Sequence, residues 1–147
     1  MAKFAYNMQS ILDIKAKLES QEKIAFTNAQ YKLRSEEQKM SQFQDKRLYY
    51  ENKMRSRMIE SLNIQELSNC NQGISLMKEA IEMQQIEVDA AQKNVDKAQI
   101  RLNEAMIQRK THEKLRDNAF EEFIKEINVQ ESKEIDELVS YNYASMA

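Results

Sequence analysis

The sequence predicts an all-α fold, a long antiparallel two-helix coiled coil (an α-hairpin), and three observations support this prediction. The 147 residues include no proline and one glycine, so the chain has few places to turn. Charged residues make up 31% and hydrophobic residues 41%, which is typical of long helices with solvated outer faces. Apolar residues also recur at helical spacing, whereas a disordered chain would have fewer of them and no sustained period.

The second half of the chain carries the clearest repeat. From Ile74 onward, steps of three and four residues follow a heptad seam with long or β-branched residues at one position and small ones at the other. The same steps then reach polar residues for about two turns, before apolar residues return at Phe120, Phe123, Ile124 and Ile127. The seam reads Ile74, Met77, Ile81, Gln84, Val88, Ala91, Val95, Ala98, Leu102, Ala105, Arg109, His112, Arg116, Ala119 and Phe123.

The first half is less regular. Its apolar residues drift around the helix, which indicates mixed seven- and eleven-residue spacing and weak local supercoiling. Bulky residues on this face are expected to fill the space opposite the alanines of the second helix. The face comprises Phe4, Met8, Ile11, Ile14, Leu18, Ala25, Ala29, Leu33, Met40, Phe43, Tyr50, Met54 and Met58.

We expect a single coiled-coil domain over residues 1–147, with helix one at about 3–64, a turn at about 65–72, helix two at about 73–139 and a flexible tail at 140–147. Ser, Asn and Gly cluster in the turn, where Ser68, Asn69 or Asn71 could cap helix two. A turn near residue 68 places position n opposite about 136 minus n, so that Phe4 faces the region of Ile127. Arms of ~60 residues extend roughly 90 Å and form a rod.

The charge is divided unevenly between the halves. Residues 1–60 hold 12 Lys and Arg against 8 Asp and Glu, and residues 61–147 hold 10 against 16, so the halves attract each other. This balance argues against a nucleic-acid partner. Cys70 is expected as a solvent-facing loop thiol, and the N-terminus lacks the apolar core of a signal peptide. No run approaches the roughly 18 apolar residues of a membrane span, so a cytoplasmic location is the default.

The sequence contains few residues that could carry out catalysis. The one histidine, His112, lies among cations, where a solvated or seam-edge role is favoured over a catalytic one. One Cys and one His cannot form a structural zinc site, and one glycine cannot form a phosphate loop. We therefore expect no enzyme activity, no cofactor, no metal and no small-molecule substrate.

Two charged regions stand out. A basic run (Lys46, Arg47, Lys53, Arg55 and Arg57) surrounds Tyr49 and Tyr50, and a solvated helix face with one tyrosine in the seam is favoured over base stacking. The second region places arginines at seam positions 109 and 116. These guanidinium groups must reach solvent, pair with acids such as Glu19 and Glu22, or contact a partner, and the residues leave structural pairing and partner contact equally open.

Three separated blocks together resemble the flagellar FliJ family, coiled-coil proteins of the bacterial flagellar type III export apparatus. The blocks read Phe4-Ala5-Tyr6-Asn7-Met8-Gln9-Ser10-Ile11-Leu12, Gln108-Arg109-Lys110-Thr111-His112-Glu113-Lys114-Leu115-Arg116-Asp117-Asn118-Ala119-Phe120-Glu121-Glu122-Phe123 and Glu131-Ser132-Lys133-Glu134-Ile135-Asp136-Glu137-Leu138. The resemblance implies a two-helix coiled coil similar to the stalk of rotary ATPases. It also implies partners: the export ATPase, whose ring receives the paired helix ends, the membrane protein of the export gate, and export chaperones.

The resemblance also implies two contact surfaces, for a cytoplasmic protein that is peripheral at the inner face of the membrane. The ATPase-ring end would include Arg109, Lys110, Lys114, Arg116, Glu131 and Asp136. The gate contact, toward the middle and tip, would include Gln38, Gln42, Tyr49, Met77, Ala80 and Gln84. Gly73 and Gln84 stand where some members are expected to have an aromatic residue and a histidine.

Periodicity alone supports two other functions. A general holdase chaperone or scaffold would use an apolar tip such as Leu62, Ile64 and Leu67, and a nucleic-acid-binding coiled coil would show salt-dependent binding. A monomer and a weak homodimer share one sequence pattern, so the oligomeric state stays open.

Overall fold

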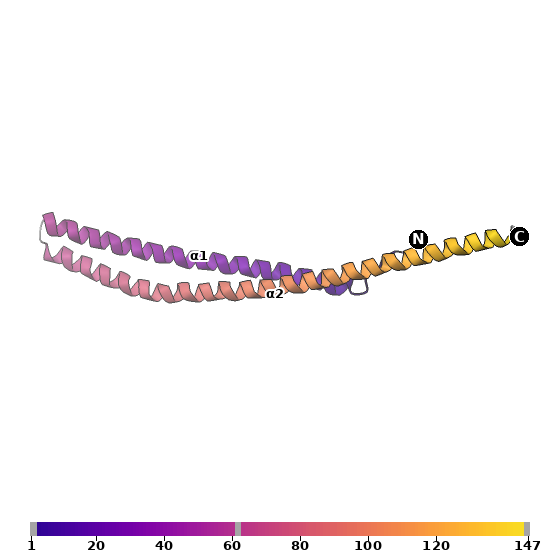
Figure 1. Cartoon of the computed structure of the whole chain (residues 1–147). Helices are drawn as coiled ribbons and strands as arrows, with labels where there is room; N and C mark the ends of the chain where they lie inside the picture. The colour runs from indigo at the N-terminus through magenta and orange to yellow at the C-terminus, as the bar shows by residue number, and fades with distance from the viewer. Residues whose placement is uncertain (1–2, 61–62, 146–147) are drawn as a thin grey trace. The chain divides into compact units, whose positions relative to one another are not determined.

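The structure, a computed structural model, describes residues 3–60 and 63–145 and consists of two long helices. Helix α1 spans Gln9–Glu60 and helix α2 spans Ile64–Ser145 (Figure 1). No strand occurs in the described ranges. The predicted all-α hairpin is therefore confirmed.

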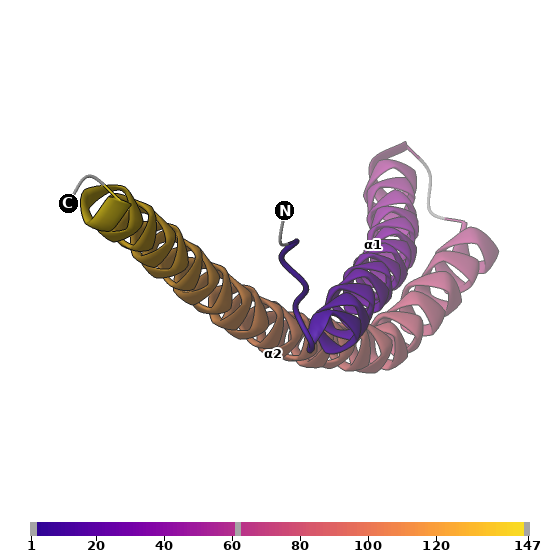
Figure 2. The same cartoon turned by 90° about the vertical axis from the view of Figure 1, so that its right-hand side faces the viewer.

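The predicted ends of the helices need correction. Residues 3–8 form a non-helical segment that leads into α1 (Figure 2). The turn expected at 65–72 is wrong, because these residues belong to α2, and the tail expected from residue 140 is helical as far as Ser145. Leu62, which was expected in the apolar tip, lies outside the described residues.

Asn63 explains where α2 begins. Its side-chain Oδ1 accepts hydrogen bonds from the backbone N–H of Gln65 at 3.0 Å and of Glu66 at 3.4 Å. Its carbonyl oxygen accepts the N–H of Leu67 at 3.0 Å. These bonds satisfy N–H groups that the first helical turn leaves unpaired, so Asn63 is the N-cap in place of Ser68, Asn69 or Asn71.

The one glycine serves packing in this fold. Gly73 is buried inside α2, and a Cβ atom built on it would lie 2.9 Å from the Tyr50 ring of α1. A glycine therefore lets the tyrosine reach the backbone of α2. Cys70, one turn earlier, is 3% exposed, so the prediction of a solvent-facing thiol is wrong. The uncharged stretch 67–77 is helical, and its inner face, which includes Cys70 and Gly73, is buried against α1.

The chain divides into two compact units. The terminal unit comprises Met1–Ser20 and Asn103–Ala147, and the central unit comprises Gln21–Leu102. In the central unit, α1 and α2 pair in antiparallel directions on both sides of the connection (Figure 1). In the terminal unit, the start of α1 and residues 3–8 pack on α2, where the Phe4 ring lies 5.1 Å from Phe120 and 5.4 Å from Phe123.

The seam predicted on α2 is confirmed at nearly every position. Ala91, Val95 and Ala98 are buried, and the other predicted positions are buried or half-buried, with the exception of Arg116, which is exposed. The alanines bring the helices close, and the polar members Gln84, Arg109 and His112 also face inward.

The drift predicted for helix one is wrong, because α1 follows a strict heptad. Its inward residues step by three and four from Leu12, but the sequence carries charged groups at several of these positions. Glu19 and Glu36 are buried at 4% and 3% exposure, whereas Ile14 and Leu18 of the predicted face are exposed. The inward positions are Leu12, Lys15, Glu19, Glu22, Phe26, Ala29, Leu33, Glu36, Met40, Phe43, Arg47, Tyr50, Met54 and Arg57.

The pairing register also differs from the predicted one. Partners across the helices include Phe4 with Phe120, Lys15 with Gln108, Glu36 with Gln84, and Arg57 with Glu66. The residue numbers in these pairs add to 120–124 in place of 136. The connection lies between Glu60 and Ile64 and not near residue 68, so the partners of α1 shift toward the N-terminus of α2 by roughly four turns.

Candidate functional site

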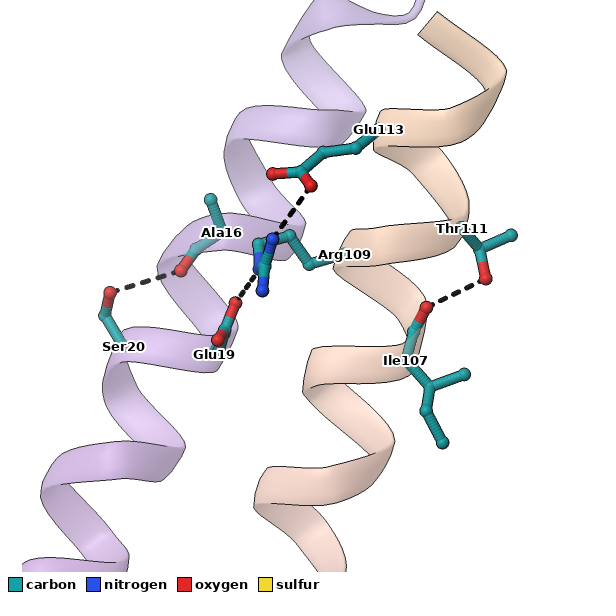
Figure 3. A network of polar contacts seen from close by, with 7 residues as sticks. All are labelled: Ala16, Glu19, Ser20, Ile107, Arg109, Thr111 and Glu113. Atoms are coloured by element: carbon teal, nitrogen blue, oxygen red, sulfur yellow. Dashed lines mark hydrogen bonds and ion pairs between the residues drawn. The ribbon is translucent and has the colours of Figure 1, made fainter. Parts of the chain in front are cut away.

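The seam of the terminal unit contains a charged layer centred on Arg109. The Nε of Arg109 donates to Oε2 of Glu19 on α1, and its Nη1 lies 2.9 Å from Oε2 of Glu113 on α2 (Figure 3). The hydrogen bond with Glu19, and then that with Glu113, raises the pKa of Arg109. Of the alternatives that the sequence left open for Arg109, the structure shows pairing with Glu19, so the guanidinium is engaged within the chain.

Two hydroxyl groups beside this layer turn away from it. Ser20 Oγ donates to the carbonyl oxygen of Ala16 at 3.2 Å, and Thr111 Oγ1 to that of Ile107 at 2.8 Å (Figure 3). His112, in the next seam position, is half-buried, and its Nδ1 is buried without a hydrogen-bond partner among the described residues. At the centre of the layer, the guanidinium of Arg109 contacts two carboxylates.

The other residues predicted at the ATPase-ring end are on the surface. Lys110, Lys114 and Arg116 are exposed on α2, and Glu131 and Asp136 are exposed further along the same helix. All six predicted residues of this set belong to the terminal unit. Arg109 differs from the other five, because it faces α1.

The last five turns of α2 have an unusual environment. Every residue over 128–145 is exposed, including Val129, Ile135, Leu138 and Val139. Four carboxylates and one lysine separate these apolar side chains. A helix of this length is marginal in water by itself, and most helical stability in proteins comes from packing. This end of α2 thus presents apolar and acidic groups that no described part of the chain covers.

The central unit contains a second polar layer, at Glu36 and Gln84. The Nε2 of Gln84 donates to the backbone oxygen of Glu36 at 2.9 Å and to its carboxylate Oε2 at 2.5 Å. Lys32 and Lys39 of α1 lie 2.8 and 3.6 Å from the other carboxylate oxygen. The hydrogen bond from Lys32, and then that from Gln84, lowers the pKa of Glu36 to about 2.

This layer corrects one predicted gate residue. Gln84 is 7% exposed and its amide is bonded to Glu36, so it does not offer a contact surface to a partner. Gln38, Gln42 and Tyr49 are exposed on α1, while Met77 and Ala80 of α2 are half-buried. All six lie in the central unit, so the structure assigns the two predicted contact sets to different units.

Tyr49 and Tyr50 divide their roles as predicted. Tyr49 is 60% exposed, with the Nζ of Lys53 6.0 Å from its ring centre. Tyr50 faces inward against Gly73. Sequence reasoning missed Glu36 entirely, and the signal that would have found it is the strict three-and-four step from Leu12, followed through charged positions as well as apolar ones.

Within the described ranges, no group of three or more His, Cys, Asp or Glu side chains is placed to hold a metal ion. None of the described helices is long and apolar enough to cross a membrane.

Comparisons with known proteins agree with this architecture. A solved structure of CT670 from Chlamydia trachomatis, a proposed YscO homologue, superposes with a TM-score of 0.74 at 18% identity and covers 96% of each chain. At this identity the match shows a shared fold. A search of curated protein sequences found no match. The sequence model of the family described as flagellar FliJ protein matches residues 4–146, almost the whole chain. The chain therefore belongs to the flagellar FliJ protein family, whose members are components of the flagellar type III export apparatus.

Proposed function

We propose that this chain is a non-enzymatic stalk or adaptor of the flagellar export ATPase. Its paired helix ends insert into the ATPase ring, promote assembly or activity of the ring and link it to the membrane export gate. The observation that carries the proposal is the end of α2, where residues 128–145 present exposed apolar and acidic side chains that no helix of the described ranges covers. Such a helix gains stability when a surrounding protein covers it.

The surface charges near this end suit a shaft within a ring. Lys110, Lys114 and Arg116 are exposed cations, and Glu131 and Asp136 are exposed acids. Exposed ion pairs contribute little each, roughly 0–1 kcal/mol, so contacts with a ring can be exchanged without a large barrier. We leave Arg109 out of this contact set, because its guanidinium binds Glu19 and Glu113.

The second partner surface of the proposal lies in the central unit. Gln38, Gln42 and Tyr49 are exposed on α1 and form the part of the predicted gate contact that solvent reaches. An exposed tyrosine is a common anchor in protein interfaces. Contact with the gate would hold the protein at the inner face of the membrane, and a direct role with export chaperones belongs to the same proposal.

Co-purification with the export ATPase tests the ring contact. We expect the wild-type chain to bind and the triple variant K110E/K114E/R116E to bind at least about tenfold more weakly. The matched control is K93E/K97E, which reverses exposed cations of α2 in the central unit and should bind as the wild type does. Failure of the wild type to bind would refute the stalk proposal, and equal binding by the triple variant would refute the residue assignment.

One observation favours a second candidate, a holdase chaperone. Residues 67–77 carry no charge, and Leu76 within this stretch and Ile64 before it are 60% and 82% exposed. Exposed apolar surface of this kind can bind unfolded chains. A holdase should suppress aggregation of a heated client enzyme, and I64S/L76S should abolish the suppression. An absence of suppression by the wild type would remove this candidate.

A further inference from the structure

A second apolar surface lies on α2 of the central unit, on the side turned away from α1. Leu76, Met83 and Ile86 are 60%, 71% and 67% exposed, and Ala90 is exposed beside them. The seam residues of the same segment, such as Gln84 and Ala91, are buried. We call Leu76, Met83, Ile86 and Ala90 the outer stripe.

The outer stripe has the spacing of a coiled-coil seam. Leu76, Met83 and Ala90 are seven residues apart, and Ile86 follows Met83 by three, so all four lie on one helix face. The corresponding position after Leu76 holds the exposed Glu79, which adds an acid to the same face. The stripe runs along about 21 Å of helix, given a rise of 1.5 Å per residue. This is two heptads, enough to pair with a helix of another chain. No helix in the described part of the chain covers this face of α2.

The charges that border the stripe are mostly acidic. Residues 76–90 hold four acids against one cation, Lys78. Glu87 borders one side of the stripe and Glu82 and Asp89 the other, as follows from 100° per residue. The acidic border ends at Lys93 and Lys97, one and two turns beyond Ala90. Charges at such flanking positions decide which helix pairs with which.

These charges indicate which kind of helix could bind to the outer stripe. Two copies of this chain that met stripe to stripe would set the acidic borders against each other, and such like-charge contacts are unfavourable. A basic helix has the opposite relation, since its lysines or arginines would meet Glu82, Glu87 and Asp89 while its apolar face covers Met83 and Ile86. We infer that the outer stripe is a docking face for a basic amphipathic helix of another protein. This inference goes beyond the stalk proposal, whose contact residues lie elsewhere; of the outer stripe, Leu76 also belongs to the exposed apolar surface of the holdase candidate.

A designed peptide tests the recognition chemistry directly. The probe is a synthetic three-heptad helix with Leu and Ile at its a and d positions and Lys at e and g, and its match carries Glu at e and g. Titration calorimetry with the full chain should show binding of the Lys peptide at least about tenfold tighter than of the Glu peptide. Equal affinity for the two peptides would overturn the proposal.

Two variants locate the binding. M83S/I86S removes two exposed apolar side chains and should weaken the Lys peptide by about tenfold or more, with the helical content unchanged. The control is I100S, because Ile100 is 58% exposed on the same helix beyond the acidic border. A loss as large in I100S as in M83S/I86S would overturn the proposal.

Two further experiments test the preference for a basic helix and the alternative that a second copy of the chain binds the outer stripe. E82K/D89K should reverse the preference, so that the Glu peptide binds better than the Lys peptide. Sedimentation of the free chain checks the rival: a wild-type dimer that M83S/I86S converts to monomer would make a second copy the occupant and overturn the proposal. Both variants should still co-purify with the export ATPase, so failure of this inference is distinguishable from failure of the stalk proposal.

Discussion

Glu19 and Glu36 are both buried in the seam of α1, but their charges are met in different ways. In the terminal unit, a guanidinium from α2 pairs with Glu19 across the seam. In the central unit, the neutral amide of Gln84 meets Glu36 across the seam, and the cations come from Lys32 and Lys39 on α1 itself. The first layer joins the helices by charge and the second by hydrogen-bond geometry. Buried polar layers of both kinds fix register in coiled coils, and each should fail under a different change.

The largest effect is expected from charge reversal in the Arg109 layer. R109E places a third carboxylate beside Glu19 and Glu113, so the melting temperature should fall by on the order of 10 °C. The double variant E19R/R109E restores opposite charges across the seam and should recover much of the loss. Thermal unfolding followed by circular dichroism measures both.

The control for this experiment is R101E, which reverses an exposed arginine of the same helix and should change the melting temperature little. A fall in R101E as large as in R109E would show that net charge, rather than the buried pair, determines the effect. Absence of any recovery in E19R/R109E would show that the pair does not act by charge.

Acid should act on the Glu36 layer. The pKa of Glu36 is lowered from 4.5 to about 2, so its contribution to stability is fully present above pH 4.5 and is lost as the pH falls toward 2. The raised pKa of Arg109 works in the opposite sense, and its contribution is lost only above the usual range of an arginine. Urea unfolding between pH 6 and pH 2 should show a smaller loss of stability in E36Q than in the wild type. E37Q, an exposed neighbour, is the control, and it should follow the wild-type curve.

These two layers also show where sequence reasoning succeeds and fails. The seam of α2 was predictable because its positions hold Ile, Val, Leu and Ala, which alternate by three and four. The seam of α1 was not, because a search for apolar residues skips Glu19 and Glu36 and then follows neighbours such as Leu18, which are exposed. The heptad continues through Glu19 and Glu36 because partners across the seam, and for Glu36 also lysines of α1 itself, compensate their burial.

The predicted position of the connection between the helices was wrong for a related reason. Asn and Gly favour turns locally, and they cluster after residue 67, yet Asn63 caps α2 and Gly73 makes room for Tyr50. Packing against α1 thus overrides local turn preference. Of the candidate contact residues, Arg109 and Gln84 already stood at predicted seam positions of the second helix, so the heptad that placed them inward argued against their use as surface contacts.

An apolar replacement of the Glu36 layer should have a moderate effect of the opposite sign. E36L/Q84L removes both polar partners together, so the melting temperature should stay the same or rise by a few degrees. Each single variant leaves one polar group buried without its partner across the seam and should melt lower than the double variant. A double variant that melts below both single variants would show that the layer is a net source of stability.

The smallest effect is expected at an exposed ion pair of the central unit. Arg57 and Glu66 join the two helices with 3.1 Å between Nε and Oε2, but their side chains are 42% and 37% exposed. Water screens such a pair, so E66Q should cost roughly 0–1 kcal/mol in urea unfolding. The difference should vanish in high salt, since exposed charges are screened there. The pair connects α1 and α2 as Arg109 and Glu19 do, and burial is the main physical difference between them. A loss of stability in E66Q as large as that in R109E would contradict this explanation. It would mean that the link between the helices, and not the burial of the ion pair, makes a charged layer costly to break.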